Sequence, residues 1–350
     1  MIRIDGADAG GQLLRSTLAL SALTQEAVRI EQVRGARSTP GVRPQHLAAI
    51  EALASVTDAV VDGAEVGADV VTFDPDPVSG GQLSIDVGTA GSASLVVDAL
   101  LPLAAALDEH LAVRVGGGTD VKWSPPLDAH LLAKLPLLRS HGWGVALECH
   151  RRGFYPEGDG DVTLHLFPST PAPFRLAERG PIERTTIRSV ATDDLADGDV
   201  ARRQVTAASS RLAEAGYEVD STIVESVSAP STGTAIVAVS AFDCGVCCGD
   251  ALGKQGRPAE VVGEGAAESL LDAIDGPGAV DAHLGDQLLL PLVVAGGKLR
   301  IPERTDHVET SLALLASFGL APAAHSDGPG GPLLEADSGA VADRLGNGGH

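Results

Sequence analysis

The histidine at position 307 stands at the predicted start of a helix, where an imidazole can act as a nucleophile. Asp306 and Glu309 fit a capping box, so we expect His307 in the first turn of a helix that runs to about residue 315. Backbone N–H groups and the positive end of the helix dipole gather there, which suits a phosphate and favours a neutral, nucleophilic imidazole. An ordinary surface histidine beside a helix cap is the alternative interpretation.

Arginines gather near the beginning of the chain. Arg15 lies on one face of a predicted helix, and Arg34 and Arg37 lie in the loop that follows the next strand. Guanidinium groups that lie close together repel one another unless anions lie between them, so phosphate oxygens are the expected partners. Surface salt bridges in an acid-rich protein are the alternative. The neutral side chains nearby that could orient a phosphate or a base are Gln12 and Gln45.

The composition indicates a folded, acidic protein. The chain has 350 residues, 44% of them hydrophobic and 21% charged, and its net charge is −22. A content of 47 acidic residues, 21 arginines and four lysines is typical of adaptation to high intracellular salt. A negative chain argues against a nucleic-acid partner, but less so where arginines converge in one cleft and salt screens the long-range repulsion.

Neither a signal peptide nor a membrane span is predicted. Residues 1–5 enter a strand-like stretch directly, and the longest apolar run, residues 94–107, contains Asp98. We therefore expect a cytoplasmic protein without a membrane partner. Three of the four cysteines form the cluster Cys244, Cys247 and Cys248, but no second CxxC or histidine pair completes a zinc site, so we interpret them as structural or incidental thiols.

The order helix, strand, loop and helix recurs along the chain, which indicates internal repeats. The copies begin near Gly10, Gly91 and Asp286, at intervals of 81 and 195 residues. The longer interval leaves room for a small domain inserted in the third copy. From about residue 180 the pattern is strand, helix, two strands and helix, which predicts a compact α+β module.

Motifs from residue 2 to about 320 resemble, in the same order, the RNA 3′-terminal phosphate cyclase family. Many co-linear motifs are far more specific than any single glycine-rich turn. The matching segments are residues 5–7, 10–16, 34–37, 40–41, 45–47, 88–92, 117–120, 152–156 and 286–288, together with His307.

The resemblance implies an α+β, α/β sandwich-like fold of three tandem repeats. Each repeat is a two-helix, four-stranded unit, and a smaller α+β domain is inserted in the third. The implied limits are residues 1–181 and 279–340 for the catalytic domain, with repeats at about 1–80, 81–160, and 161–181 plus 279–340, then 182–278 for the inserted domain and 341–350 for a frayed tail.

The resemblance also implies ATP-dependent conversion of an RNA 3′-phosphate to a 2′,3′-cyclic phosphate, with release of AMP and diphosphate. By position, His307 takes AMP from ATP and passes it to the RNA 3′-phosphate, after which the neighbouring 2′-OH displaces AMP. The expected partners are RNA with a 3′-phosphate end, ATP as co-substrate, and a divalent cation, Mg²⁺ or Mn²⁺. The oligomeric state stays open, with a homodimer as one option.

Individual site residues carry over by position. Arg15, Arg34 and Arg37 match catalytic arginines of the family. Asp286 is expected to accept a hydrogen bond from His307 or a nucleotide hydroxyl, with a helix N-cap as the alternative. The residues expected to bind the nucleotide are Gln12, Gln45, His283, Asp286 and Gln287.

Three positions depart from the family pattern. Asp8 replaces a glutamate that helps to hold the divalent ion, and because magnesium accepts either carboxylate, Asp8 is the predicted metal ligand. His283 replaces a frequent tyrosine and is expected to stack on adenine with less area. Asp98 stands where glutamine is common, and no role is predicted for it.

Two other functions are compatible with a fold of this kind. A non-catalytic RNA-binding relative that serves ribosome assembly in eukaryotes has the same fold but lacks the nucleophilic histidine. An enolpyruvyl transferase is built from similar repeats and would need a cleft lined by lysine and arginine, without a covalent nucleotide. An AMP adduct on His307 would distinguish the cyclase from both.

Overall fold

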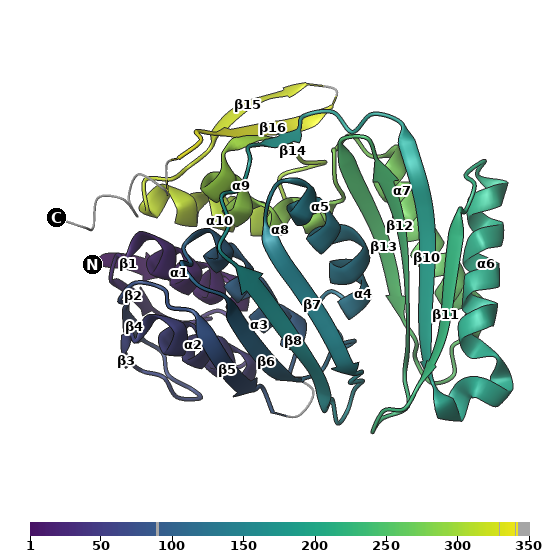
Figure 1. The fold of residues 1–350 in the computed structure, drawn as a ribbon, viewed down its shortest axis with the longest axis horizontal. Helices are drawn as coiled ribbons and strands as arrows, with labels where there is room; N and C mark the ends of the chain where they lie inside the picture. Colours follow the sequence, from purple (N-terminus) through teal and green to yellow (C-terminus); the bar gives the residue numbers. More distant parts are fainter. Residues whose placement is uncertain (89–90, 329, 340, 342–350) are drawn as a thin grey trace.

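The computed structural model describes residues 1–88, 91–328, 330–339 and 341, and its chain folds into layered sheets and helices (Figure 1). Residues 89 and 90 of the predicted 88–92 motif lie outside the described residues. The predicted frayed tail at residues 341–350 also lies outside them, apart from Val341.

The first unit of the fold is a four-stranded sheet with two helices. Its first two strands pair in parallel and the others antiparallel, in the order β1-β2-β4-β3. In chain order its elements are β1 (Ile2–Asp5), α1 (Gly11–Thr24), β2 (Val28–Glu31), α2 (Pro44–Thr57), β3 (Val60–Asp62) and β4 (Val71–Asp74).

The second unit repeats this topology, with the strand order β5-β6-β8-β7. A π-helical turn, η2, interrupts its second helical segment. The elements are β5 (Gly81–Asp86), α3 (Ala93–Leu100), the 3₁₀ helix η1 (Leu101–Ala105), β6 (Leu111–Gly117), α4 (Leu127–Ala129), η2 (His130–Lys134), α5 (Leu135–Ser140), β7 (Gly144–Arg151) and β8 (Gly160–Phe167).

The third unit has the same pairing, because β9 and β14 are parallel while β16 lies antiparallel to both β14 and β15. The α+β fold of repeated two-helix, four-stranded units is therefore confirmed over the described residues. The elements are β9 (Phe174–Leu176), α8 (Ala282–Gln287), α9 (Leu289–Ala295), β14 (Gly297–Arg300), α10 (Asp306–Ser317), β15 (Ala323–Gly328) and β16 (Gly331–Ala336).

The inserted module lies in the chain between β9 and α8, and in space beside the second unit (Figure 1). Its strand order is β11-β10-β12-β13, and α6 and α7 pack on its sheet around a separate apolar core that includes Ile187, Ile236 and Leu270. The elements are β10 (Ile182–Thr192), the 3₁₀ helix η3 (Asp193–Gly198), α6 (Val200–Glu214), β11 (Ser221–Val227), β12 (Thr234–Phe242), β13 (Gly245–Leu252) and α7 (Ala259–Asp275). The predicted limits of the inserted module, residues 182–278, and the predicted limits of the repeats stay predictions. Strand β8 pairs within the second sheet, although the predicted third repeat begins at residue 161, inside this strand.

Helix α1 shows how the apolar pattern positions polar side chains. Leu14, Leu18 and Ala22 are buried in the main core, as their spacing predicts. Gln12 and Arg15 lie on the neighbouring face near the start of the helix, which lines the cavity described below. No helix among the described residues is long and apolar enough to cross a membrane.

Candidate active site

A cavity of about 830 Å³ lies where α1, α3, α8 and α10 meet the inserted module. It brings together nine of the ten predicted site residues from distant parts of the chain, while Asp8 does not line it. Convergence alone does not test their roles, which stay predictions. The nine are Gln12, Arg15, Arg34, Arg37, Gln45, His283, Asp286, Gln287 and His307.

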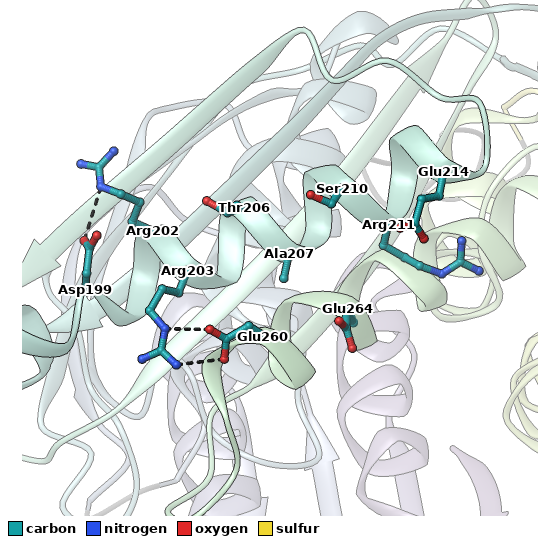
Figure 2. Close-up of a pocket in the computed structure, with 10 residues that line it drawn as sticks. All are labelled: Asp199, Arg202, Arg203, Thr206, Ala207, Ser210, Arg211, Glu214, Glu260 and Glu264. Carbon is teal, nitrogen blue, oxygen red and sulfur yellow. Dashed lines mark hydrogen bonds and ion pairs between the residues drawn. The ribbon is translucent and has the colours of Figure 1, made fainter.

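A smaller hollow of about 390 Å³ lies between α6 and α7 of the inserted module (Figure 2). Four of its charged side chains pair with one another. Arg203 donates to Glu260 at 2.8 and 2.9 Å, and Arg202 lies 3.4 Å from Asp199. Exposed and mutually neutralised charges of this kind form a solvated surface, so the hollow has none of the features of the larger cavity.

Arg15 is the most unusual cation of the cavity. Its guanidinium has no hydrogen bond and no ion pair within the described part of the chain. Burial lowers the pKa of Arg15 to about 10, although Asp98 and Asp286 oppose this effect. A desolvated guanidinium without a partner favours an anion that comes from outside the chain.

The loop after β2 adds further positive charge at the cavity. Arg34 adopts a left-handed conformation with φ of 55°, and its guanidinium donates to the carbonyls of Thr39 at 2.8 Å and Gly41 at 3.1 Å. Burial and the neighbouring Arg43 and Arg37 lower the pKa of Arg34. Arg34 therefore shapes the loop as well as contributing charge, whereas the exposed Arg37 makes no contact of this kind among the described residues.

A neutral histidine lies beneath these arginines. His46 is 2% exposed, and its Nδ1 accepts a hydrogen bond from the Arg43 N–H at 3.1 Å. Burial, together with Arg15, Arg34 and Arg43, lowers the pKa of His46 to about 3. Its ring lies so close to α1 that a Cβ on Gly11 would be 1.9 Å from Nε2, and a side chain there would displace it. The sequence motif contains His46, but no role is predicted for it.

Asp286 is held by side chains of two other helices. The Gln12 amide donates to both of its oxygens at 2.8 Å, and the Ser311 hydroxyl donates to Oδ1 at 3.3 Å. The alternative that Asp286 is a helix N-cap is wrong, because Asp286 lies within α8, whose N-cap is Asp281, and the next helix, α9, has Leu288 as its N-cap. Burial raises the pKa of Asp286 despite the Gln12 hydrogen bond and the nearby His307.

His307 lies in the first turn of α10, as predicted, and is exposed at the cavity. The predicted capping box is wrong. The N-cap is Thr305, whose hydroxyl accepts from the Val308 N–H at 3.2 Å, and Glu309 pairs instead with Arg304 at 2.6 Å. The helix therefore begins one residue earlier than predicted, with Thr305 rather than Asp306 as its cap. The N–H groups of the first turn that the cap does not satisfy lie beside the imidazole.

His283 and Gln287 lie four residues apart on α8, so they share a face towards the cavity. The inserted module meets them through β13, which places Asp250 at the cavity wall. Burial raises the pKa of Asp250, and the nearby His283 opposes this effect. No strand is predicted at β13, so the contribution of the inserted module to the wall is new information from the structure.

A cluster of ionisable groups that has no predicted role lines the cavity beside Arg15. Asp98 accepts from His130 Nε2 at 2.6 Å and from Lys134 Nζ at 2.7 Å. Burial alone would raise the pKa of Asp98, but Lys134 and His130 outweigh it and hold the pKa well below its usual range. The sequence does contain a signal, since His130 and Lys134 are four residues apart in a leucine-rich segment and Asp98 interrupts an apolar run.

A resident metal ion does not fit the residues around Asp8. Asp8 lies in an exposed turn between β1 and α1, and no group of three or more histidine, cysteine, aspartate or glutamate side chains in the described chain could hold a metal ion. Magnesium is usually held by one or two carboxylates together with substrate phosphates and water, so the described side chains alone make no complete site here. The predicted role of Asp8 as a ligand of the divalent ion stays a prediction.

The fold and the cavity define an α+β protein of repeated sheets with a cationic, histidine-bearing site where its units meet. The family model for RNA 3′-terminal phosphate cyclase matches residues 7–322. The chain belongs to the RNA 3′-terminal phosphate cyclase family, and it is an enzyme of that family rather than a non-catalytic relative.

Similar proteins support this assignment along nearly the whole chain. The RNA 3′-terminal phosphate cyclase of Halobacterium salinarum is 46% identical over 326 residues, covering 90% of this chain and 94% of that protein. The protein of the same name from Pyrococcus furiosus is 40% identical over 322 residues, covering 91% and 93%. Among solved structures, the enolpyruvyl transferase NikO from Streptomyces tendae matches with 19% identity and a TM-score of 0.27, over 47% of this chain and 33% of that chain. This similarity is too weak to support a conclusion about function.

Proposed function

We propose that this enzyme converts an RNA 3′-terminal phosphate to a 2′,3′-cyclic phosphodiester at the expense of ATP, with release of AMP and diphosphate. The reaction runs through a covalent histidyl-AMP and an RNA-adenylate intermediate. The observation that carries the proposal is the unpartnered guanidinium of Arg15 in the same cavity as His307. Anionic phosphates supply the missing partner, and the histidine supplies the nucleophile.

In the first step an imidazole nitrogen of His307 attacks the α-phosphorus of ATP. A P–N bond forms and the P–O bond to diphosphate breaks, so that AMP is left on the histidine. Arg15, Arg34 and Arg37 neutralise the phosphate oxygens as charge moves onto the diphosphate. Gln12 keeps Asp286 in place, which leaves the carboxylate beside the imidazole but hydrogen-bonded to the amide.

In the second step an oxygen of the RNA 3′-phosphate attacks the phosphorus of histidyl-AMP and breaks the P–N bond. The product is an RNA-adenylate with a good leaving group. In the third step the neighbouring 2′-OH attacks the RNA phosphorus, AMP departs, and the hydroxyl proton is released to solvent. The last step is intramolecular, because the 2′-OH and the activated 3′-phosphate belong to the same ribose, and this favours it strongly.

We propose that His283 and Gln287 contact the nucleoside part of ATP, with Gln45 near its phosphates. A divalent cation, Mg²⁺ or Mn²⁺, would accompany the nucleotide and shield its phosphates, since the described side chains provide no protein-only cage for it. The expected compartment is the cytoplasm, where RNA ends and ATP are both available.

A turnover assay tests the proposed function. An RNA oligonucleotide with a labelled 3′-phosphate is incubated with ATP, Mg²⁺ or Mn²⁺ and the enzyme at high potassium chloride. The expected product has an end that resists phosphatase and becomes sensitive again after mild acid opens the cyclic phosphate. RNA with a 3′-OH and reactions without ATP serve as controls. An end that stays phosphatase-sensitive under every metal and salt condition would overturn the proposal.

A further inference from the structure

Trp123 is an indole presented almost entirely to solvent at the edge of the cavity. Its side chain is 95% exposed, the highest value for a large apolar residue in the described chain, and it lines the cavity mouth between β6 and α4. The other tryptophan, Trp143, is 2% exposed. Because tryptophan normally buries most of its large surface, this placement needs a reason beyond folding.

The backbone at Trp123 is held in an uncommon conformation. Its φ is +64°, in the left-handed region that costs a non-glycine residue roughly 1 kcal/mol or more. Strain of this kind persists only where the surrounding structure imposes it, and it gathers at functional sites. The conformation that places the indole in solvent therefore lowers the stability of the fold.

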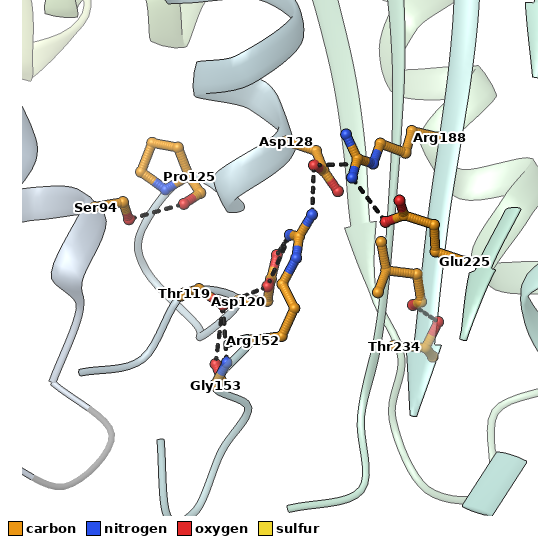
Figure 3. A network of polar contacts seen from close by, with 11 residues as sticks. Ser94, Thr119, Asp120, Pro125, Asp128, Arg152, Gly153, Arg188, Glu225 and Thr234 are labelled. Atoms are coloured by element: carbon orange, nitrogen blue, oxygen red, sulfur yellow. Dashed lines mark hydrogen bonds and ion pairs between the residues drawn. The ribbon is translucent and has the colours of Figure 1, made fainter. Parts of the chain in front are cut away.

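Both ends of the loop are firmly anchored. On one side the carbonyl of Pro125 accepts from Ser94 Oγ at 3.0 Å, and on the other Thr119 and Asp120 are buried next to Arg152 (Figure 3). The Leu127 N–H also donates to the Thr119 carbonyl at 3.1 Å. An anchored loop with an exposed ring is a preorganised platform rather than a loose segment.

The surroundings of the indole are those of a single-strand nucleic-acid site. Lys122, one of four lysines in the chain, is its exposed neighbour in the sequence, and Arg15, Arg34 and Arg37 line the same cavity. Proteins bind single-stranded nucleic acid by combining positive charge along the backbone with aromatic rings on which bases stack. Stacking on the indole does not depend on the base sequence, because every base has an aromatic face that can stack.

We infer that Trp123 stacks on a base of the RNA close to its 3′ end and so guides the reacting phosphate into the cavity. This inference rests on the proposed function. If the terminal phosphate lies between Arg15 and His307, the rest of the RNA strand has to leave the cavity through its mouth, where Trp123 is located. ATP is proposed to contact His283 and Gln287 of α8, so the ring on the loop between β6 and α4 is left for the polymer.

The test compares RNA binding by four forms of the full chain at high potassium chloride without ATP. The probe is a single-stranded RNA of mixed sequence with a 3′-phosphate and a 5′-fluorophore, followed by anisotropy. Trp123→Ala is expected to weaken binding by about five- to a hundredfold, the usual effect of removing one base–aromatic stack. Trp123→Phe should retain most of the affinity. Tyr155→Ala removes an aromatic that is 68% exposed but does not line the cavity, and it should bind like the wild type.

A second readout comes from the intrinsic fluorescence of the protein. The exposed Trp123 and the buried Trp143 emit at different wavelengths, so stacking of RNA on Trp123 should quench the red-shifted component only. Labelling of Trp123→Ala by AMP from ATP should equal that of the wild type, because the adenine is held elsewhere.

Each failure has a distinct meaning. If wild type and Trp123→Ala bind the RNA equally, the stacking inference is overturned while the proposed function stands. If Trp123→Ala loses labelling by AMP but keeps RNA affinity, the indole serves the adenine of ATP and the inference is wrong. If the wild type neither binds the RNA nor cyclises its end, the proposed function fails as well.

Discussion

Two arginine clusters in this molecule share their residue types and differ in what surrounds them. In the cavity, Arg15 and Arg37 have no carboxylate partner among the described residues. Between the second unit and the inserted module, Arg152 donates to Asp128 at 2.6 Å and to Asp120 at 3.2 Å (Figure 3). The positive charge of the first cluster is not compensated by carboxylates, whereas that of the second is compensated by Asp120 and Asp128.

The paired cluster is a structural joint. Arg152, Asp120 and Asp128 are 4%, 3% and 0% exposed, and Arg188 of β10 extends the network to Asp128 at 3.3 Å and to Glu225 of β11 at 2.7 Å. Burial opposes the charge of Arg152, but Asp120 and Asp128 outweigh burial and raise its pKa. The pKa of Arg152 is raised and that of Arg15 is lowered, because Arg152 has two carboxylate partners within hydrogen-bonding distance and Arg15 has none among the described residues.

Removing the arginine of the joint should damage the fold most. Arg152→Met leaves the buried Asp120 without a cation and Asp128 with Arg188 alone, so we expect a loss of about 3–5 kcal/mol in the free energy of unfolding. Denaturant unfolding at constant high potassium chloride measures it. A loss below about 1 kcal/mol would show that the network contributes little, because that is the range of exposed pairs.

Removing the unpaired arginine should have the reverse effect on stability. Arg15→Met deletes a desolvated charge that has no internal partner, so the unfolding free energy should stay equal or rise. Cyclisation should fall about a hundredfold or more, as when one positioned charge or donor is lost from a transition state. Turnover and unfolding are measured on the same preparation. A less stable variant with normal turnover would contradict the distinction between the two clusters.

The neutral histidine under the arginines predicts a pH dependence of stability. The pKa of His46 is lowered from 6.5 to about 3 in the fold, so the unfolded chain takes up a proton first as the pH falls below 6.5. Stability present above pH 6.5 should therefore be lost at up to about 1.4 kcal/mol per pH unit below it. His46→Gln should show a shallower loss between pH 6.5 and 4.5. Asp286 changes stability in the opposite sense, so the quantity compared is the difference between the two proteins.

The smallest effect is expected on the inserted module. Arg203 forms a bidentate pair with Glu260 on the exposed surface of α6 (Figure 2). Arg203→Met should leave the unfolding free energy nearly unchanged, because solvent screens an exposed pair, and it should leave cyclisation unchanged. It is the matched control for Arg152→Met, since both remove a paired arginine and differ in burial. A cost near that of Arg152→Met would mean that burial is not what matters.

Much of the fold could be predicted from local patterns. The apolar face of α1 and the glycine breaks that begin each unit recur at intervals, so repeats are visible without any tertiary information. Strand β13 could not be predicted, because glycines and cysteines obscure the alternation and its stability comes from β12 and α7. The cap at Thr305 differs from the predicted one by a single residue, a boundary that pattern alone does not resolve.

The residues of the candidate site also fall into those that local spacing could predict and those that it could not. Residues that share a motif, such as Gln12 with Arg15, could be named because their spacing places them on one helix face. The contact of Asp98 with Lys134, and the approach of Asp250 to the cavity wall, depend on how separate units pack. No local signal specifies that packing, although a lone charge in an apolar run marks such positions as worth examining.

The most direct test of the proposed chemistry is covalent labelling of the enzyme with α-labelled ATP, with Mg²⁺ or Mn²⁺ at high potassium chloride. Wild type and His307→Ala are compared, with Arg203→Met as a control for handling. The mechanism predicts an acid-labile, alkali-stable AMP adduct on the wild type and on Arg203→Met, and none on His307→Ala. An adduct of equal amount on His307→Ala, or no adduct on the wild type under any of these conditions, would contradict a histidyl-AMP mechanism.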